Sequence, residues 1–461
     1  MLHGWRYLSD EAKARIETGI VENRALGGPW HAVVFPTHIC NIGCFFCQSN
    51  APARSEVLPW PVLKSFLEEN ARRNLCLIEL TGGGEPLLYP QILPLLDSCA
   101  ENGILVEHLV TNGILLAPMA RHFTEVGLDW VTISLNECDP ARYASMMKTD
   151  PRNLVLALEG VEAMIEARDS VTSRVCPRIW LQLMLWKGNA AHIAEMYEFA
   201  RCLDVDTIFF RTIGGQRGHA KITAEELPAV HGQLREIIRE DITSGENRLH
   251  FDLMHEQQLH LFAYEEMRKH NPPVSENFPD FRRAQPRNEF CFLAWFSTGI
   301  DACGTVYPCF EYHCPFNKVL GSILRESMSV IWNGPRYRRF RAEIHELMYL
   351  GGDMEASYRF YPFLEPKCID REGCQYTANL ATPDFYARVA RRVRPRNTPW
   401  RRLRARTCDC AMRLSHRLLN CLRKSLRPDH RRRFRRTANS SDLAPRGAGR
   451  IRQPERIAGN R

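Results

Sequence analysis

The stretch PTHICNIGCFFCQSN, residues 36–50, places Cys40, Cys44 and Cys47 at C-x3-C-x2-C spacing, with no fourth cysteine in this neighbourhood. A structural zinc site or an ordinary iron–sulfur cluster takes four protein ligands. Three thiols at this spacing therefore predict a metal centre with one coordination position left open. The spacing alone leaves two alternatives, a zinc site completed by a distant histidine such as His38, and unmodified thiols.

The cysteines follow the first of six short apolar runs rich in β-branched residues. The runs cover residues 31–36, 75–82, 105–112, 129–136, 178–185 and 206–213. Amphipathic stretches with apolar residues at helical spacing lie between them. Near-continuous apolar strands that alternate with helices predict a parallel sheet covered by helices, here a barrel-like α/β domain.

Residues of unusual type stand at the ends of the first four runs. The cysteines follow the first run, TGGGEP (81–86) ends the second, Thr111 and Asn112 end the third, and Ser134 and Asn136 end the fourth. Barrel-like α/β domains carry their active sites at the carboxyl ends of the strands. The four segments therefore predict a single site at these carboxyl ends, which form the rim of the domain.

The glycine motif suits the binding of a small molecule. Glycines let the backbone approach a ligand closely, and the carboxylate of Glu85 can accept hydrogen bonds from an ammonium group. A simple glycine turn is the alternative for such a motif in isolation. Its place on the same rim as the cysteines favours a binding role.

The cysteine spacing, with Phe46 before the last cysteine and a GGE sequence after the second strand, resembles the radical S-adenosylmethionine (radical SAM) superfamily over residues 28–215. The resemblance implies a partial (β/α)6 barrel and a [4Fe–4S] cluster held by the three cysteines, with SAM on the open iron. It also implies that an electron from the cluster cleaves SAM to methionine and a 5′-deoxyadenosyl radical, which abstracts a hydrogen atom from the substrate.

Residue by residue, the resemblance assigns SAM contacts to Phe46, Gly83, Gly84, Glu85 and Ser134. Glu85 matches the residue that holds the methionine amine, and Phe46 matches the aromatic position near the adenine. Thr111 and Asn112 resemble a third-strand ending that faces SAM or substrate. Asn136 stands where relatives often carry Asp.

A second cysteine series begins at Cys291, which Gly304 and Cys309 follow as C-x12-G-x4-C, and continues with Cys368 and Cys374 as C-x5-C. The series resembles the SPASM/twitch extension of radical SAM enzymes, a small cysteine-rich domain that binds auxiliary iron–sulfur clusters. A zinc ribbon is the alternative interpretation.

The series departs from the complete two-cluster pattern, because Glu365 and Ala378 stand where that pattern has cysteines. We therefore expect one auxiliary [4Fe–4S] cluster. Its expected ligands are Cys291, Cys309, Cys368 and Cys374. Cys303 and Cys314 remain as further candidate ligands.

The composition is that of an ordinary globular protein, with 44% apolar and 25% charged residues among 461. No apolar run approaches the roughly 20 residues of a membrane span, and the N-terminal sequence lacks a secretory pattern. We therefore expect a cytoplasmic protein, in which disulfides are rare. Five cysteines that occur singly are expected to pack as core residues. They are Cys76, Cys99, Cys138, Cys176 and Cys202.

The net charge of +8 is unevenly distributed. Residues 391–461 hold 23 Lys and Arg against 4 Asp and Glu, whereas the remainder holds 38 against 49. An Arg-rich tail binds RNA or an acidic partner through its charge, or is simply disordered and solvated. The tail leaves these alternatives open.

We expect five segments: a helical lead-in (1–27), the radical SAM core (28–215), a helical connection (216–285), the SPASM/twitch-like domain (286–380) and the Arg-rich tail (391–461). The resemblance implies an oxidoreductase-type enzyme that modifies a peptide, or a small molecule such as an aminocyclitol or sugar alcohol. It also implies an electron donor such as a flavodoxin or ferredoxin. The alternatives are an RNA-modifying enzyme that uses the tail and a non-catalytic iron–sulfur scaffold.

Overall fold

The computed structural model describes residues 3–47, 49, 55–170, 176–213, 220–253, 257–270, 291–309, 319–350, 388–389 and 392–393. The chain divides into two compact units, Met1–Pro395 and Arg396–Arg461. All described residues belong to the first unit, so the Arg-rich tail lies almost wholly outside them. No helix among the described residues is long and apolar enough to cross a membrane.

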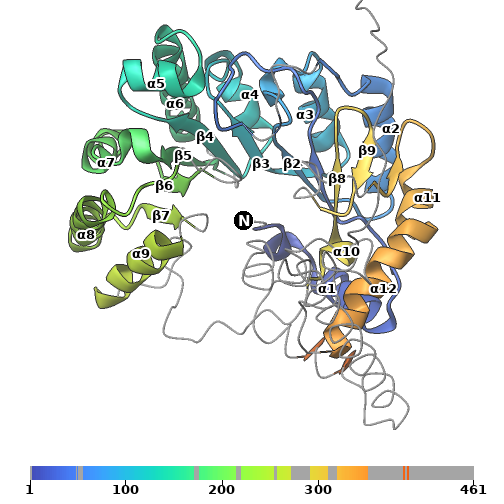
Figure 1. Ribbon diagram of the computed structural model, residues 1–461. Coiled ribbons are helices and arrows are strands. Elements are labelled where there is room, and N and C mark those ends of the chain that lie inside the picture. Colours follow the sequence, from blue (N-terminus) through green and yellow to red (C-terminus); the bar gives the residue numbers. More distant parts are fainter. Residues whose placement is uncertain are drawn as a thin grey trace, which may run out of the picture. The chain divides into compact units, whose positions relative to one another are not determined.

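A ten-stranded sheet organises the first unit, in the order β10-β9-β8-β1-β2-β3-β4-β5-β6-β7 (Figure 1). Strands β1 to β7 run parallel, β8 pairs parallel to β1, and β9 and β10 continue antiparallel. The strands are β1 (His31–Val34), β2 (Leu77–Leu80), β3 (Leu105–Thr111), β4 (Trp130–Asn136), β5 (Arg178–Leu185), β6 (Thr207–Thr212), β7 (Leu249–Asp252), β8 (Ser297–Ile300), β9 (Thr305–Tyr307) and β10 (Gly321–Ser322). The six predicted strands and the parallel sheet are confirmed. The sheet stays open, since its described edges are β10 and β7.

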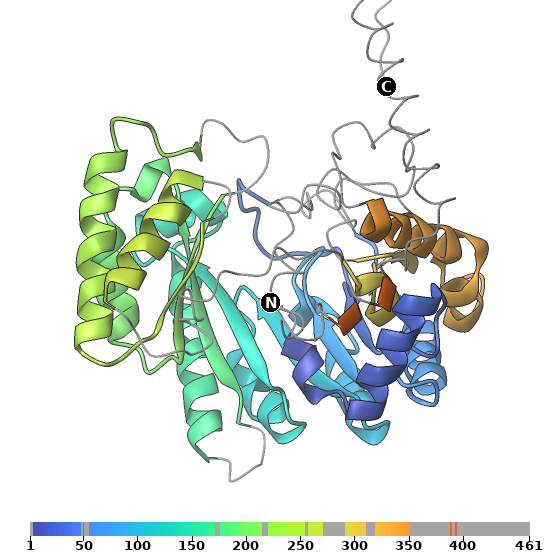
Figure 2. The ribbon, with the colours of Figure 1, turned by 90° about the horizontal axis from the view of Figure 1, so that it is seen from below.

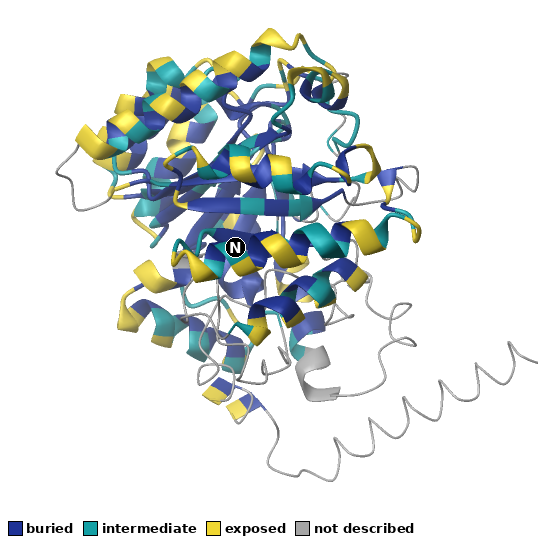
Figure 3. Ribbon diagram, turned by 90° about the vertical axis from the view of Figure 1, so that its left-hand side faces the viewer, coloured by how far each residue is buried: buried dark blue, intermediate teal, exposed yellow. Residues whose placement is uncertain are grey.

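The described residues form twelve α-helices, most of which follow a strand. They are α1 (Asp10–Glu22), α2 (Trp60–Ala71), α3 (Ile92–Glu101), α4 (Ala120–Glu125), α5 (Pro140–Met147), α6 (Arg152–Ser170), α7 (Ile193–Arg201), α8 (Leu227–Thr243), α9 (Gln257–Lys269), α10 (Leu293–Phe296), α11 (Met328–Asn333) and α12 (Pro335–Leu350). Short 3-10 helices are η1 (His3–Tyr7), η3 (Pro86–Leu88), η4 (Ala117–Met119) and η5 (Lys187–Asn189). Figure 1 shows α2 to α8 along the outer side of the curved sheet. Figure 3 shows buried strands and helices whose buried and exposed residues alternate.

The sheet extends beyond the six predicted units at both edges. Strand β7 lies within residues 216–285, where the sequence analysis expected only helices, and pairs with β6. Strand β8 comes from the C-terminal cysteine region and pairs with β1. Figure 2 shows α1 (dark blue) with α11 and α12 (orange) at the same end of the sheet as β8 and β9 (yellow). The segment boundaries stay a prediction.

The single cysteines divide into two groups. Cys99 is fully buried in the main core, as expected, and Cys76 and Cys138 are partly buried. Cys176 and Cys202 are exposed. The expectation of core packing is therefore wrong for the last two, which lie at or beyond helix and strand ends where the chain meets solvent.

The two faces of the sheet carry different side chains. Apolar residues such as Val131, Leu181 and Ile208 are buried in the core that the helices cover. A row of rings belongs to the other face, on five successive strands. The rings are His108, Trp130, Trp180, Phe209 and His250, with neighbouring centroids 4.5–5.5 Å apart. Alternation along each strand produces both faces.

A buried acid lies beside this row. Glu107 sits at a bulge in the β2–β3 pairing, and its Oε2 is 3.6 Å from Nε2 of His31. Burial, together with the charge of Glu79, raises the pKa of Glu107 to about 8, and burial lowers the pKa of His31 to about 4. Near neutral pH the two groups are therefore an uncharged acid and an uncharged imidazole, not an ion pair.

This arrangement predicts a pH-dependent stability. The folded pKa of Glu107 lies above its unfolded value, so the contribution of this residue to stability falls as the pH rises from about 4.5 to about 8. Glu107→Gln removes this dependence. Relative to wild type, the variant should gain at least about 1 kcal/mol between pH 5 and pH 8, since one pKa unit corresponds to about 1.4 kcal/mol. Thermal or denaturant unfolding at both pH values measures it.

The control for this measurement is Glu101→Gln, at the exposed end of α3. That variant should keep the wild-type pH dependence. Equal pH dependence in the two variants would show that Glu107 is ionised in the folded protein.

Candidate active site at the carboxyl ends of the strands

The cysteine loop that follows β1 is fastened on two sides. On one side the backbone of His38 donates to the carbonyl of Glu56 at 2.9 Å. On the other side the N–H groups of Gly43 and Phe45 donate to the last two carbonyls of α5, at 3.0 and 3.1 Å. Backbone contacts of this kind fix the path of the loop and hence the position of its thiols.

The three thiols of the loop lie close enough to affect one another. Burial raises the pKa of Cys40 to about 11. Burial, and then the charges of Cys47 and Cys40, raise the pKa of Cys44 further. The Sγ of Cys44 also lies 3.6 Å from the Sδ of Met147 at the end of α5. Partly buried thiols of this kind become thiolates most readily beside a cation, and the iron of an iron–sulfur cluster is a suitable one.

The glycine motif packs directly against the start of the cysteine loop. A Cβ at Gly84 would lie 2.1 Å from the carbonyl oxygen of Ile39 and 2.5 Å from the carbonyl carbon of His38. The next residue, Glu85, donates its backbone N–H to the same Ile39 oxygen at 2.8 Å. Only glycine allows this approach. The motif therefore fixes the position of Ile39, the residue directly before Cys40.

The carboxylate of Glu85 joins the ends of two strands. It is 3% exposed and accepts from the hydroxyl of Thr111 at 2.7 Å, the backbone N–H of Asn112 at 2.8 Å and that of Leu87 at 3.1 Å. Burial raises its pKa, and these hydrogen bonds act in the opposite direction. A carboxylate offers about four acceptor positions, so Oε2 keeps capacity for the predicted ammonium contact, which stays a prediction.

Asn112 links the third strand to the cysteine loop. Its side-chain amide donates to Oδ1 of Asn41 at 2.7 Å, while its own Oδ1 accepts from the backbone of Ile114. Thr111 and Asn112 are both buried. The structure thus brings the third-strand ending into contact with both the glycine motif and the cysteine loop.

The fourth-strand residues meet a partner that the sequence analysis missed. Nε2 of Gln182, on β5, donates to Oδ1 of Asn136 at 3.0 Å and lies 3.3 Å from Oγ of Ser134. Asn136 adopts φ of 67°, a left-handed conformation that Asn tolerates better than most residues. Its amide lies 3.6 Å from the Met147 sulfur that Cys44 also meets. No local sequence pattern indicates Gln182. It reaches these residues because β5 pairs with β4.

Phe46 lies at the edge of an aromatic group. Its ring centroid is 5.6 Å from that of Phe45, which in turn lies 4.8 Å from that of Trp186, just after β5. The sequence analysis did not predict Trp186. The predicted role of Phe46 beside the adenine stays a prediction.

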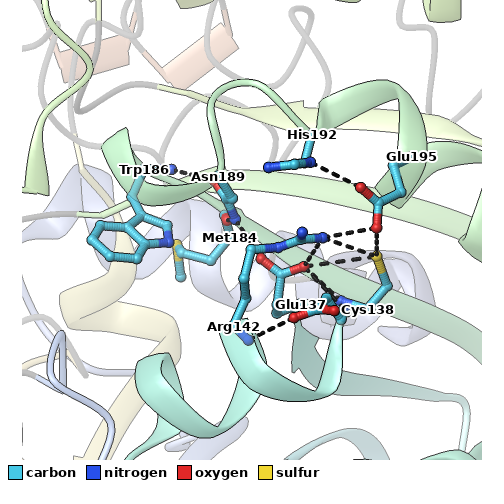
Figure 4. Close-up of polar contacts among 9 residues, drawn as sticks. Glu137, Cys138, Arg142, Met184, Trp186, Asn189, His192 and Glu195 are labelled. Carbon is cyan, nitrogen blue, oxygen red and sulfur yellow. Dashed lines mark hydrogen bonds and ion pairs between the residues drawn. The ribbon is translucent and has the colours of Figure 1, made fainter.

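A charged network fixes the strand ends next to this group (Figure 4). The buried carboxylate of Glu137 lies 3.1 Å from Nη2 of Arg142 and accepts from Nδ2 of Asn189 at 3.2 Å. Arg142 also pairs with Glu195 at 2.9 Å. Because these residues come from the end of β4 and from α5, η5 and α7, the network holds α5, and with it the cysteine loop, against the sheet.

The C-terminal cysteines lie partly within the described residues. Cys291 and Cys309 are partly buried and pack against one apolar cluster that includes Trp5, Phe292 and Phe296. Strands β8 and β9 pair antiparallel and form a hairpin. Cys291 precedes β8 and Cys309 follows β9, so both cysteines lie at the open end of this hairpin. The other predicted features of the series lie outside the described residues: Cys314, Glu365, Cys368, Cys374 and Ala378.

A loop of three thiols, held by a glycine motif at the carboxyl ends of parallel strands, is the arrangement expected of an α/β iron–sulfur protein. Residues 34–200 match the radical SAM superfamily, and residues 291–350 match the SPASM iron–sulfur cluster-binding domain. The chain therefore carries a radical SAM domain and a SPASM domain. The cofactors of this family are a [4Fe–4S] cluster and SAM, with further iron–sulfur clusters at the SPASM domain.

Individual relatives agree with this assignment. A probable GTP 3′,8-cyclase from Sulfurisphaera tokodaii is 30% identical over 37% of this chain and 52% of its own length. A GTP 3′,8-cyclase from Marinobacter nauticus is 31% identical over 45% of this chain and 63% of its own length. The chain thus spans about half to two thirds of these curated relatives. The structure of histidine-tagged anSMEcpe with bound AdoMet has a TM-score of 0.50 at 15% identity, covering 79% of this chain and 92% of that one, which shows a common fold.

The residues present fit the cluster and SAM of this family. The donor set is three thiols on one loop, and the loop leaves one cluster position without a predicted ligand. The close approach at Gly84 fixes that loop beside a glycine motif.

This close approach generates a prediction about iron content. Gly84→Ala should push the Ile39 backbone away and lower the iron of the reconstituted protein by the content of one cubane, about four irons per chain. Anaerobic iron analysis and the visible absorption of the clusters measure the loss.

The control is Gly232→Ala in α8, where an added Cβ meets no atom within 4 Å. That variant should keep its full iron content. A Gly84→Ala protein with the iron content of the wild type would contradict the role of this contact.

Proposed function

We propose that this chain is an enzyme that, with its cluster and SAM bound, produces a 5′-deoxyadenosyl radical and uses it to abstract a hydrogen atom from a substrate. The observation that carries the proposal is the convergence of the cysteine loop, the glycine motif and the third-strand ending around the Glu85 carboxylate. A scaffold that only stores a cluster has no need for this arrangement.

Different residues of the rim would bind the cluster and the separate parts of SAM. Cys40, Cys44 and Cys47 would hold the cluster and leave one iron open. Gly83, Gly84 and Glu85 would contact the methionine part of SAM, Phe46 the adenine, and Ser134 a further part of the cofactor. Glu85, Thr111 and Asn112 are buried, and such surroundings limit the access of water to a reactive radical.

We propose that the substrate binds on the ring-lined face of the sheet, next to the rim. Arg211 lies within 3.1 Å of Asp252 and 3.4 Å of Oε1 of Gln182, at the carboxyl ends of β5 to β7. The buried ring of Trp180 and the partly buried ring of Phe209 pack against each other on the same face of the sheet. This mixture suits a polar substrate with hydrogen-bonding groups, and we propose a peptide or a sugar-type small molecule that is modified oxidatively.

The C-terminal cysteines would support the oxidative outcome. A single auxiliary [4Fe–4S] cluster at Cys291, Cys309, Cys368 and Cys374 would provide an acceptor for the electron that an oxidised substrate releases. We further propose a flavodoxin or ferredoxin as the reductant of the cluster on the rim, and work in the cytoplasm, where such donors occur.

The remaining candidate functions have less support. An RNA-modifying role depends on residues 391–461, of which only residues 392 and 393 are described. The GTP 3′,8-cyclase relatives match over less than half of this chain, so they support the shared radical chemistry without assigning a nucleotide substrate.

The test replaces Cys40, Cys44 and Cys47 together with Ala. The reconstituted variant should form no 5′-deoxyadenosine from SAM, because no cluster remains on the rim, and should keep about four irons per chain at the auxiliary site. Chromatographic detection of 5′-deoxyadenosine under anaerobic reduction, with iron analysis, measures both. Wild-type levels of 5′-deoxyadenosine from the variant would refute the proposal, and Cys202→Ser, at an exposed position, serves as the matched control.

A further inference from the structure

Three side chains from distant parts of the sequence meet beside the cysteine loop. A ring nitrogen of His38, a carboxylate oxygen of Glu56 and the Sγ of Cys303 all lie within 4.8 Å of one another. His38 precedes the cysteine loop, Glu56 follows it, and Cys303 belongs to the turn between β8 and β9. The three atoms are neither predicted cluster ligands of the rim nor SAM contacts.

Sheet pairing explains how these residues meet. Strand β8 pairs parallel to β1, with Val34 opposite Ile300, and the backbone of Phe35 donates to the Ile300 carbonyl at 2.9 Å. His38 and Cys303 stand four and three residues beyond this pair. The segments therefore leave the sheet together at the rim.

The backbone holds His38 and Glu56 in place before any ligand binds. The N–H of His38 donates to the carbonyl of Glu56 at 2.9 Å, and Thr37 forms an isolated bridge with Val57. Nδ1 of His38 lies 3.1 Å from Oε2 of Glu56. His38 is fully buried, whereas the Glu56 side chain is 44% exposed, which leaves the site open to an ion from solvent.

A tight turn holds Cys303 in the same way. Oδ1 of Asp301 accepts from the backbone of Cys303 at 3.0 Å and of Thr305 at 2.8 Å, and the hydroxyl of Tyr307 donates to the second oxygen at 3.0 Å. Gly304 follows with φ of 68°, which suits glycine. The turn is thus fixed by a buried carboxylate, as supporting residues fix ligands in metal sites.

We propose that His38, Glu56 and Cys303 form a mononuclear zinc site. Imidazole, carboxylate and thiolate are the three ligand types of zinc, and three protein ligands with an open fourth position are common in zinc sites. One carboxylate and one thiolate balance the charge of the ion. Ligand atoms around a tetrahedral zinc lie roughly 3.3–3.8 Å apart, as bond lengths of about 2.0–2.3 Å require, so the group needs only a small contraction. The zinc would join the cysteine loop to the SPASM part of the chain.

Hairpin geometry separates this site from the auxiliary cluster. Cys303 stands at the turn of the β8–β9 hairpin, whereas Cys291 and Cys309 stand at its other end. About three residues of strand, roughly 10 Å at 3.3 Å per residue, lie between them. A single [4Fe–4S] cluster is too small to bind Cys303 at one end of the hairpin and Cys291 and Cys309 at the other. Cys303 is therefore better placed as a zinc ligand than as a ligand of that cluster.

The test measures zinc and iron together in the full-length chain, reconstituted anaerobically with iron and sulfide and then equilibrated with Zn²⁺ and desalted. Cys303→Ser should bind about one zinc fewer per chain than wild type, with unchanged iron. Glu56→Gln, at an exposed position where folding is not at risk, should bind Zn²⁺ at least about tenfold more weakly in competition with a chelator, because loss of even a supporting residue has such an effect.

Cys202→Ser, which removes an exposed cysteine elsewhere, should match the wild type in both metals. Wild-type zinc binding by either Cys303→Ser or Glu56→Gln would overturn the proposal. A loss of about four irons in Cys303→Ser would also overturn it, by making Cys303 a cluster ligand. The proposal goes beyond radical chemistry, and 5′-deoxyadenosine formation is measured separately, so failure of one leaves the other intact.

Discussion

The carbonyl oxygen of Ile39 is the point on which the rim depends. It accepts the backbone N–H of Glu85 at a place where Gly84 has no side chain to prevent the approach. The Glu85 carboxylate then carries the same connection to the third strand through Thr111 and Asn112. One residue thus couples three strand ends through its backbone and its side chain, and the cysteine loop takes its position from that coupling.

The sheet beneath the rim separates stability from chemistry. The face covered by α2 to α8 (Figure 1) is apolar and supplies the main core, whereas the other face carries rings and polar groups on β3 to β7. Burial of polar groups on the second face is unfavourable for their charged forms. Glu107 and His31 are examples, since burial keeps both neutral near pH 7. Such groups weaken a fold and are retained at functional surfaces more often than elsewhere. The buried carboxylate of Glu137, in contrast, is paired with Arg142 and accepts from Asn189. These contacts hold α5 in place.

Local sequence predicted much of this protein, and long-range pairing explains most of what it did not predict. The six β/α units were readable because each strand is a compact apolar run before a turn. Strand β7 was not, since LHFD is only four residues long and two of them, His250 and Asp252, are polar. The pairing of β8 with β1 joins segments more than 250 residues apart, and no local pattern encodes it. The same holds for Gln182 beside Asn136.

Residue type predicted the cysteines and the glycine motif, but their geometry adds roles that type alone does not give. The sequence analysis assigned Glu85 to an ammonium group, and the structure gives its carboxylate three protein donors as well. Cys303 was a leftover candidate for an iron–sulfur cluster. Its meeting with His38 follows from the pairing of β8 with β1, and backbone contacts with His38 and Thr37 bring Glu56 to the same place.

The central claim is that the loop of Cys40, Cys44 and Cys47 holds a cluster whose open iron binds SAM. Low-temperature EPR of the reduced wild-type protein, recorded with and without SAM, tests it most directly. The account predicts that SAM changes the g values of one cluster signal, and that this signal is absent when the three cysteines are replaced. Identical spectra with and without SAM, under conditions where equilibrium dialysis shows SAM to be bound, would contradict it.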